Sequence, residues 1–253
     1  MSTRRRSAAL LATLCLALAG LWQTSADAGL LASATRIVYP IGDREQVLEV
    51  SNTGQVPVLV QTWVDDGQPN AAPQDSASPF VALPAVFRLE PGGRQSLKLV
   101  FNSRPQPQDR ESLFWLNLLE IPATPTDAAP GDRLTLTLQT QMKLFLRPAA
   151  LADTQEQAAR RQVFNLIHEA GRLRLRWHNP SPYYITLDHL RLSAGASQLS
   201  VPGDMLAPYA SVILDIAPTS GPKLASGSKA LLHYQSIGDQ GTPKALEQEV
   251  AVP

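Results

Sequence analysis

The sequence predicts an all-β protein built from two consecutive β-sandwich domains. Short runs rich in leucine and β-branched residues recur between clusters of Gly, Pro, Asn and Asp, and this spacing favours sandwiches over helices. Proline is abundant, with 21 residues, while aromatic residues are few. The texture of the sequence changes once, near Pro148, and the chain of 253 residues is long enough for two ordinary domains.

The N-terminal segment, residues 1–28, has the pattern of a signal peptide for export. Arg4–Arg6 form a basic region, Ala8–Leu21 an uncharged apolar run, and Ala26–Ala28 a small-x-small cleavage site. The apolar run is too short for a comfortable membrane span. We expect cleavage after Ala28 and a mature chain that starts at Gly29. The only cysteine, Cys15, lies in this leader, so the mature chain has no disulfide and no cysteine metal site.

The first half of the mature chain, residues 29–148, contains about seven predicted strands, the number expected of an immunoglobulin-like sandwich. Pro84 interrupts one of them, which we expect at a sheet edge because proline cannot donate to a strand ladder. Asn52–Gly54 and Pro91–Gly93 supply turns, and a loop at Pro122–Asp132 precedes the last strand. The predicted strands are Arg36–Tyr39, Gln46–Ser51, Val58–Asp65, Phe80–Arg88, Gln95–Phe101, Ser112–Ile121 and Leu134–Arg147.

The second half, residues 149–253, begins with an alanine- and charge-rich linker at Ala149–Gln162 that has room for one helical turn. A second series of strands follows, with a strong turn at Asn179–Pro182. We expect a second sandwich and a binding cleft where the two domains meet. The predicted strands are Gln162–Glu169, Arg172–His178, Tyr184–Ser193, Val212–Ile216, Lys229–Ser236 and Lys244–Val252.

The last strand of the first half carries two unusual features. Its first part places Leu134, Leu136 and Leu138 on one face, with hydroxyl residues between them. Its second part holds a lone cation, Lys143, among apolar residues, and Arg36 is in a similar setting on the first strand. A cation inside an apolar strand needs an anionic partner or a route to water, because burying it unpaired is costly.

In an unbroken strand the leucines and Lys143 cannot all face the same side. Leu138 and Lys143 are an odd number of residues apart, so a regular strand points them to opposite faces. If both serve one partner, a bulge or a twist at Gln139–Gln141 would reconcile them, and the sequence leaves open whether a bulge is present.

Charge and aromatic content argue against a nucleic-acid partner. The chain has 22 basic and 22 acidic residues, so its formal net charge is zero and it lacks a bulk electrostatic footprint for nucleic acid. We interpret Trp63, Phe114 and Trp115 as residues of the core or its rim and not as a stacking platform.

No pattern predicts an enzyme, a cofactor or a small-molecule substrate. The sequence lacks a Gly-x-Ser-x-Gly elbow, a phosphate-cradling glycine loop and a paired-carboxylate motif. Asp65–Gly67 is a turn signal, because a calcium loop needs further oxygen ligands in sequence. The histidines have no tight metal-ligand spacing, and we expect no metal site. They are His168, His178, His189 and His233.

Six motifs occur in a fixed order along the mature chain. They are Thr35–Tyr39, Asn52 followed by Val58–Trp63, Pro79–Phe80, Asp109–Asn117, Lys143–Pro148 and Asn179–Tyr184. In this order the chain resembles the periplasmic pilus-assembly chaperones of the chaperone-usher pathway. The resemblance implies two immunoglobulin-like domains in a boomerang arrangement, binding of fimbrial (pilin) subunits in the periplasm, and delivery of these subunits to an outer-membrane usher.

The same resemblance implies roles for individual residues. Leu134, Leu136 and Leu138 would form a donor strand that completes the subunit's sandwich. Arg36 and Lys143 would lie in the interdomain cleft and bind the subunit's C-terminal carboxylate.

An interdomain ion network of Glu111, Arg147 and Asp239 is also implied by the resemblance. The match at Asp239 departs from the family pattern, because Gly238 precedes it and Gln240 separates it from the next glycine. The departure weakens the assignment of Asp239 relative to the other two residues.

Two other classes of function remain open from the sequence. A secreted structural sandwich protein that forms a fibre itself usually carries an N-terminal donor extension, which the short segment Gly29–Ala34 hardly provides. A carbohydrate-binding module would need more aromatic residues than this chain offers. A chaperone would give a soluble one-to-one complex with a subunit, whereas a fibre subunit would polymerise and a sugar module would do neither.

Overall fold

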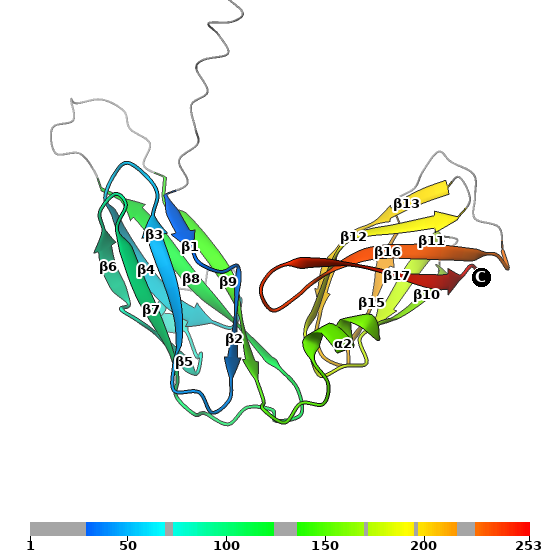
Figure 1. Ribbon diagram of the computed structural model, residues 1–253, viewed down its shortest axis with the longest axis horizontal. Coiled ribbons are helices and arrows are strands. Elements are labelled where there is room, and N and C mark those ends of the chain that lie inside the picture. The colour runs from blue at the N-terminus through cyan, green and yellow to red at the C-terminus, as the bar shows by residue number, and fades with distance from the viewer. Residues whose placement is uncertain (1–28, 69–72, 124–135, 170–171, 195–196, 217–225) are drawn as a thin grey trace, which may run out of the picture.

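The structure, a computed structural model, describes residues 29–68, 73–123, 136–169, 172–194, 197–216 and 226–253. These residues form two β-sandwiches, which confirms the predicted all-β fold. Figure 1 shows that the sandwiches meet at one end and diverge from there. The expected leader and Leu134 lie outside the described residues. Within the described ranges, no helix is long and apolar enough to cross a membrane.

The described part of the first sandwich consists of two sheets, with the strand orders β1-β3-β7-β5 and β2-β9-β8-β4-β6. The paired strands are antiparallel except β2 and β9, which run parallel. The elements are β1 (Leu30–Ala32), β2 (Arg36–Pro40), β3 (Gln46–Asn52), β4 (Val58–Asp65), the 3-10 turn η1 (Pro73–Asp75), β5 (Phe80–Leu83), β6 (Val86–Leu89), β7 (Arg94–Phe101), β8 (Ser112–Pro122) and β9 (Leu138–Arg147).

Five of the strands predicted for this sandwich are confirmed to within one residue at each end, namely β2, β3, β4, β7 and β8. The interrupted run Phe80–Arg88 is two strands, β5 and β6, which flank Pro84 and belong to different sheets. Each is the edge strand of its sheet, as expected for a segment broken by proline. The prediction missed β1, whose three residues are too few to show an alternating pattern.

The strand β9 starts later than predicted and pairs regularly. It begins at Leu138, whereas Leu136 is described but precedes the strand and is 65% exposed. The question of a bulge at Gln139–Gln141, which the sequence left open, is answered in the negative, because β9 pairs with β8 from Leu138 to Leu146 without a register shift. No bulge is needed, since the leucines and Lys143 lie on opposite faces of a regular strand.

The second sandwich has one sheet of order β10-β11-β15 and another of order β13-β12-β16-β17, in which β14 also pairs with β12. Its predicted strands are confirmed to within one residue at each end, and the short strands β13 and β14 were missed. The elements are α2 (Gln155–Arg160), β10 (Val163–Glu169), β11 (Arg172–His178), β12 (Ile185–Ala194), β13 (Ser197–Val201), β14 (Asp204–Leu206), β15 (Ser211–Asp215), β16 (Lys229–Ile237) and β17 (Pro243–Ala251).

The helix α2 accounts for the helical turn expected in the linker. It begins with a capping box, in which the Thr154 hydroxyl accepts from the Gln157 backbone and the Gln157 side chain accepts from the Thr154 backbone. Such reciprocal bonds satisfy two of the backbone N–H groups left free at a helix start. The buried Ala158 and Ala159 attach α2 to the core of the second sandwich.

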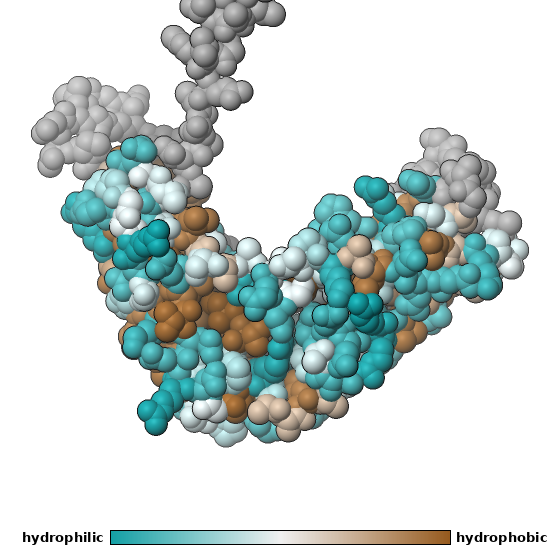
Figure 2. Space-filling view, viewed as in Figure 1, coloured by the Kyte–Doolittle hydropathy of each residue, from teal (hydrophilic) through white to brown (hydrophobic). Residues whose placement is uncertain are grey.

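Each sandwich has its own hydrophobic core. The buried cluster of the first runs from Ile37 to Leu146, and that of the second from Ala158 to Val252, with no residue in common. Two independent cores are the physical criterion for two domains. In the view of Figure 2, apolar surface gathers on the first sandwich, whereas the second is mostly polar.

Candidate functional site

Arg36 and Lys143 are direct neighbours across the parallel strands β2 and β9. Both side chains therefore leave the same face of the sheet, which is the outer face, because Leu144 on β9 points into the core. The Lys143 ammonium lies 5.8 Å from the ring centroid of Trp115, its register partner on β8. Arg36 Nη1 donates to the carbonyl oxygen of Ile237 in the second sandwich, at 3.3 Å.

The two cations lack a counter-charge in direct contact. Neither forms an ion pair within the described part of the chain, and the buried Nε of Arg36 has no hydrogen-bond partner there. Burial lowers the pKa of Lys143, and the charge of Arg36 lowers it further, while Asp204 opposes both. Burial also lowers the pKa of Arg36, with Asp239 opposing. Two partly desolvated positive charges side by side make a site for an anion.

One side of β9 is open next to these cations. Its partner β2 begins at Arg36, opposite Lys143, so the residues from Leu138 to Met142 pair with β8 alone in the part of the chain that is described. Leu138 is 56% exposed at the far end of this open edge. An open edge offers unpaired backbone N–H and C=O groups to another strand.

A buried polar network supports the outer face of β9, and the sequence analysis missed it. The Asn117 side chain on β8 is fully buried, and its Oδ1 accepts from the side chains of Gln139 and Gln141, each at 2.8 Å. Its Nδ2 donates to Asp65 Oδ2 at 2.7 Å, and Trp63 Nε1 donates to the same oxygen at 3.1 Å. Asp65 is thus a network residue as well as the start of a turn. A polar residue amid the apolar run of β8 was the only signal for it.

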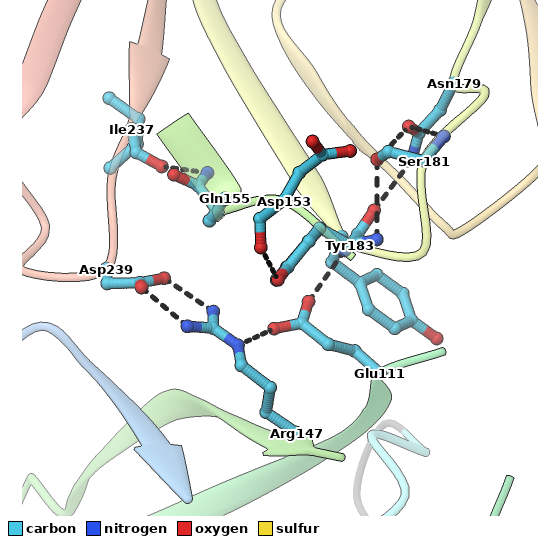
Figure 3. A network of polar contacts seen from close by, with 10 residues as sticks. Glu111, Arg147, Asp153, Gln155, Asn179, Ser181, Tyr183, Ile237 and Asp239 are labelled. Carbon is cyan, nitrogen blue, oxygen red and sulfur yellow. Dashed lines mark hydrogen bonds and ion pairs between the residues drawn. The ribbon is translucent and has the colours of Figure 1, made fainter. Parts of the chain in front are cut away.

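The predicted ion network joins the two sandwiches (Figure 3). Arg147 Nε donates to Glu111 at 2.7 Å, and its two terminal nitrogens donate to the two oxygens of Asp239, each at 2.7 Å. The second oxygen of Glu111 accepts from the Tyr184 backbone at 2.8 Å. The structure therefore brings together all three residues, including Asp239, whose local sequence departs from the family pattern.

Burial and charge act in opposite directions on this network. Burial raises the pKa of Glu111, whose side chain is 1% exposed, while the charge of Arg147 opposes the rise. For Arg147, burial lowers the pKa, but hydrogen bonds to Asp239 and the charge of Glu111 outweigh it and raise the pKa. The guanidinium is therefore held in its charged form.

Aromatic side chains add further contacts between the sandwiches. The Phe145 ring lies 5.8 Å from that of Tyr184, and the Arg147 guanidinium lies 5.0 Å from the ring centroid of Tyr183. The Tyr209 hydroxyl also donates to the Asp109 carbonyl at 3.2 Å, and the Arg110 guanidinium lies 4.9 Å from the Tyr209 ring centroid. These contacts were not predicted, since nothing in the sequence links positions so far apart.

The histidines do not gather into a metal site. No group of three or more His, Cys, Asp or Glu side chains able to hold a metal ion occurs among the described residues. His189 and His233 line an open hollow on the second sandwich together with Arg160, Arg191 and Glu247. These two histidines thus lie on the surface of the second sandwich, whereas β2 and β9, which carry the two cations, belong to the first.

Two family models match the chain. One, described as the pili and flagellar-assembly chaperone, PapD N-terminal domain, matches residues 29–152. The other, described as the pili assembly chaperone PapD, C-terminal domain, matches residues 158–248.

Individual relatives agree with these models. The chaperone protein FimB/FhaD of Bordetella pertussis is 37% identical over 231 residues, covering 90% of this chain and 90% of that protein. The solved CupB2 chaperone of Pseudomonas aeruginosa is 32% identical with a TM-score of 0.72, over 88% of this chain and 100% of that one. A chain of the solved complex between the Salmonella enterica SafA pilin and the SafB chaperone is 27% identical with a TM-score of 0.66, over 87% of this chain and 95% of that one.

Proposed function

This chain belongs to the PapD family of pilus-assembly chaperones, and we propose that it binds pilus subunits by supplying them with strand β9 and passes them to an outer-membrane usher. As a member of this family the protein is a periplasmic chaperone and not an enzyme. Family membership also decides against the two other classes considered above, the fibre-forming subunit and the carbohydrate-binding module.

The chemistry of the proposal starts from a subunit whose sandwich lacks one strand. Such a molecule exposes its core and two unpaired sheet edges, and it aggregates unless they are covered. A strand of this protein would supply backbone hydrogen bonds along the edge and an apolar side chain at every second position. The exposed Leu136 and Leu138 are available for this role, and Leu134 would extend the row. Each leucine buried in the subunit contributes about 1.5–3 kcal/mol before ordering costs.

The direction of the subunit strand follows from the position of the cations. Arg36 and Lys143 mark the C-terminal end of the open edge of β9. A subunit chain that pairs with this edge and ends with its carboxylate at the two cations must run parallel to β9, in line with β2. The carboxylate then forms charge-assisted hydrogen bonds, which are stronger than neutral ones and fix the register of the pairing.

We further assign the network of Glu111, Arg147 and Asp239 to holding the two domains at a fixed relative position around this site. The protein would reach the periplasm by removal of residues 1–28 as a signal peptide. Its two domains would comprise residues 29–148 and 149–253.

The observation that carries the proposal is the pair of partly buried cations at the end of an open sheet edge, which have no ion-pair partner among the residues that the structure describes. The test is co-expression with a candidate pilus subunit from the same organism, followed by size-exclusion chromatography. We expect a soluble one-to-one complex that is lost in Arg36→Ala and Lys143→Ala. Arg176→Ala, which removes an exposed cation of the second sandwich, serves as the control. Recovery of normal complex from both cleft variants would refute the anchoring role.

A further inference from the structure

We propose that the turn between β16 and β17, residues 238–242, is part of the carboxylate site, and that Gly241 is a positioning residue that lets this turn orient Arg36. The inference rests on the function proposed above and deepens it. It gives the second sandwich a role in binding the subunit's chain end, which it exerts through Arg36.

The turn is tied to Arg36 through the residue before it. Ile237, the last residue of β16, accepts the hydrogen bond from Arg36 Nη1 at 3.3 Å. The turn itself is held by two backbone bonds, from Gly238 N to the Thr242 carbonyl at 3.1 Å and from Gly241 N to the Gly238 carbonyl at 2.9 Å. A displacement of this turn therefore moves the carbonyl that holds Arg36.

Gly241 lies directly against Thr35, the residue before Arg36. A Cβ at position 241 would overlap the Thr35 hydroxyl and would lie 3.5 Å from Thr35 Cβ. Gly241 also has a φ of +75°, in the left-handed region that glycine adopts without a steric penalty. The absence of a side chain thus allows the turn of the second sandwich to approach the start of β2 closely.

The hydrogen bond to Ile237 leaves Arg36 available to bind an anion. The Ile237 carbonyl is neutral, so it orients the Arg36 guanidinium without cancelling its charge, and it occupies only one of the five N–H donors. Asp239, whose charge acts on Arg36, has both carboxylate oxygens engaged by Arg147. The interdomain network thereby keeps Asp239 from closing an ion pair with Arg36, and the guanidinium stays open to an incoming carboxylate.

The test compares two glycines with the same backbone conformation. Gly227 has a φ of +78°, but a Cβ there meets nothing within 4 Å. Gly227→Ala and Gly241→Ala therefore introduce the same backbone strain, and only the second displaces a neighbour. Thermal unfolding followed by circular dichroism would establish that both variants are folded.

The measurement is the affinity of the full mature protein for a synthetic peptide of the subunit's last strand, prepared as the free acid and as the C-terminal amide. We expect the wild type and Gly227→Ala to prefer the acid by about tenfold or more. Gly241→Ala should lose most of this preference while it retains affinity for the amide. A general packing defect would weaken both peptides equally, so the ratio isolates the orientation of Arg36.

A second substitution should relieve the overlap between positions 241 and 35. Thr35→Ala in the Gly241→Ala background removes the overlapping hydroxyl and leaves only a Cβ at ordinary van der Waals distance, so the preference for the acid should return. Thr35→Leu crowds the same contact from position 35, without placing a side chain on the left-handed Gly241. It should reduce the preference for the acid even if Gly241→Ala does not fold.

The outcomes distinguish the positioning role of Gly241 from the carboxylate anchor itself. If Gly241→Ala and Thr35→Leu keep the full preference while Arg36→Ala loses it, the positioning role is refuted and the proposed function stands. If the wild type and Arg36→Ala show no preference for the acid, the carboxylate anchor itself is refuted.

Discussion

Asp65 and Asn117 share a buried hydrogen bond of 2.7 Å, and through it the end of β4 supports the strand proposed to bind the subunit. The amide of Asn117 is used at both ends, since its oxygen accepts from Gln139 and Gln141. These two glutamines flank the centre of the open edge of β9. The network therefore connects the interior of the first sandwich to its binding edge.

Asn117→Ala should lower the free energy of unfolding by about 1–3 kcal/mol, because it removes one donor from the buried Asp65 carboxylate, which keeps Trp63 Nε1, and takes the shared acceptor from Gln139 and Gln141. Urea denaturation of the free protein measures this loss. Ser96→Ala, at an exposed position of β7, is the control and should change stability by less than about 0.5 kcal/mol. An equal effect of the two substitutions would show that the network contributes nothing to stability.

Lys143→Met should stabilise the free protein at neutral pH while it abolishes subunit binding. Burial lowers the pKa of Lys143 below its ordinary value of 10.5, so the folded state disfavours the charged form that the unfolded chain retains. Between the lowered pKa and 10.5 the unfolded state binds more protons, and the stability of the wild type must rise with pH in that window. The stability advantage of Lys143→Met should therefore shrink as the pH rises through it.

Unfolding free energies from pH 7 to 11, compared between Lys143→Met and the wild type, test this directly. Lys98→Met replaces an exposed lysine that pairs with Glu45 and should show no such advantage at pH 7. A Lys143→Met protein that is less stable than the wild type at pH 7 would contradict the assignment of Lys143 as a destabilising, functional cation.

Leu136→Glu should leave the free protein as stable as the wild type but prevent formation of the subunit complex. Leu136 is 65% exposed in the free protein, so a charge there costs little, whereas in the complex it would enter the apolar groove of the subunit. Leu83→Glu, at an exposed leucine on the edge strand β5 of the other sheet, should leave the complex intact. Co-purification of the subunit with each variant decides the matter, and a stable complex with Leu136→Glu would argue against donor-strand binding.

Within the interdomain network, Glu111→Ala should destabilise the protein more than Asp239→Ala. The Glu111 side chain is 1% exposed and that of Asp239 is 35% exposed, so solvent compensates much more for loss of the latter. We expect a loss of about 3 kcal/mol for Glu111→Ala, near the lower end for breaking a buried pair, because Arg147 keeps Asp239. Asp239→Ala should cost about 1 kcal/mol. Calorimetry of the free protein measures both, and the reverse order would show that exposure does not set the strength of these pairs.

The strands were predictable wherever one segment carried its own pattern. β4 and β11 were placed to the residue, since alternation and flanking turns defined both ends. Pro84 likewise marked the break between β5 and β6. The short strands β1, β13 and β14 were not predictable, because three to five residues show no alternation and depend on backbone pairing with neighbours.

The candidate site was predictable only where a residue was locally out of place. Lys143 and Arg36 stood out as cations among apolar neighbours, and the family resemblance connected them. Asn117 is likewise out of place in the apolar run of β8, but its partners Asp65, Gln139 and Gln141 gave no signal. The contact of Gly241 with Thr35 gave none either, since only the fold brings these two residues together. The regular pairing of β9 could not be predicted, because the sequence does not show whether one face or both faces of the strand serve the partner.

The even-numbered side chains of β9 differ along the length of the strand in what they pack against. Met142, Leu144 and Leu146 fill the core of this protein, while Leu138, on the same face, remains outside it. If the first half of β9 were withdrawn from a bound subunit, Leu138 would therefore return to solvent and not to a core of this protein. Under the proposed function, relaxation of the chaperone would not drive release of a bound subunit, and a replacement segment that fits the subunit better would supply the driving force.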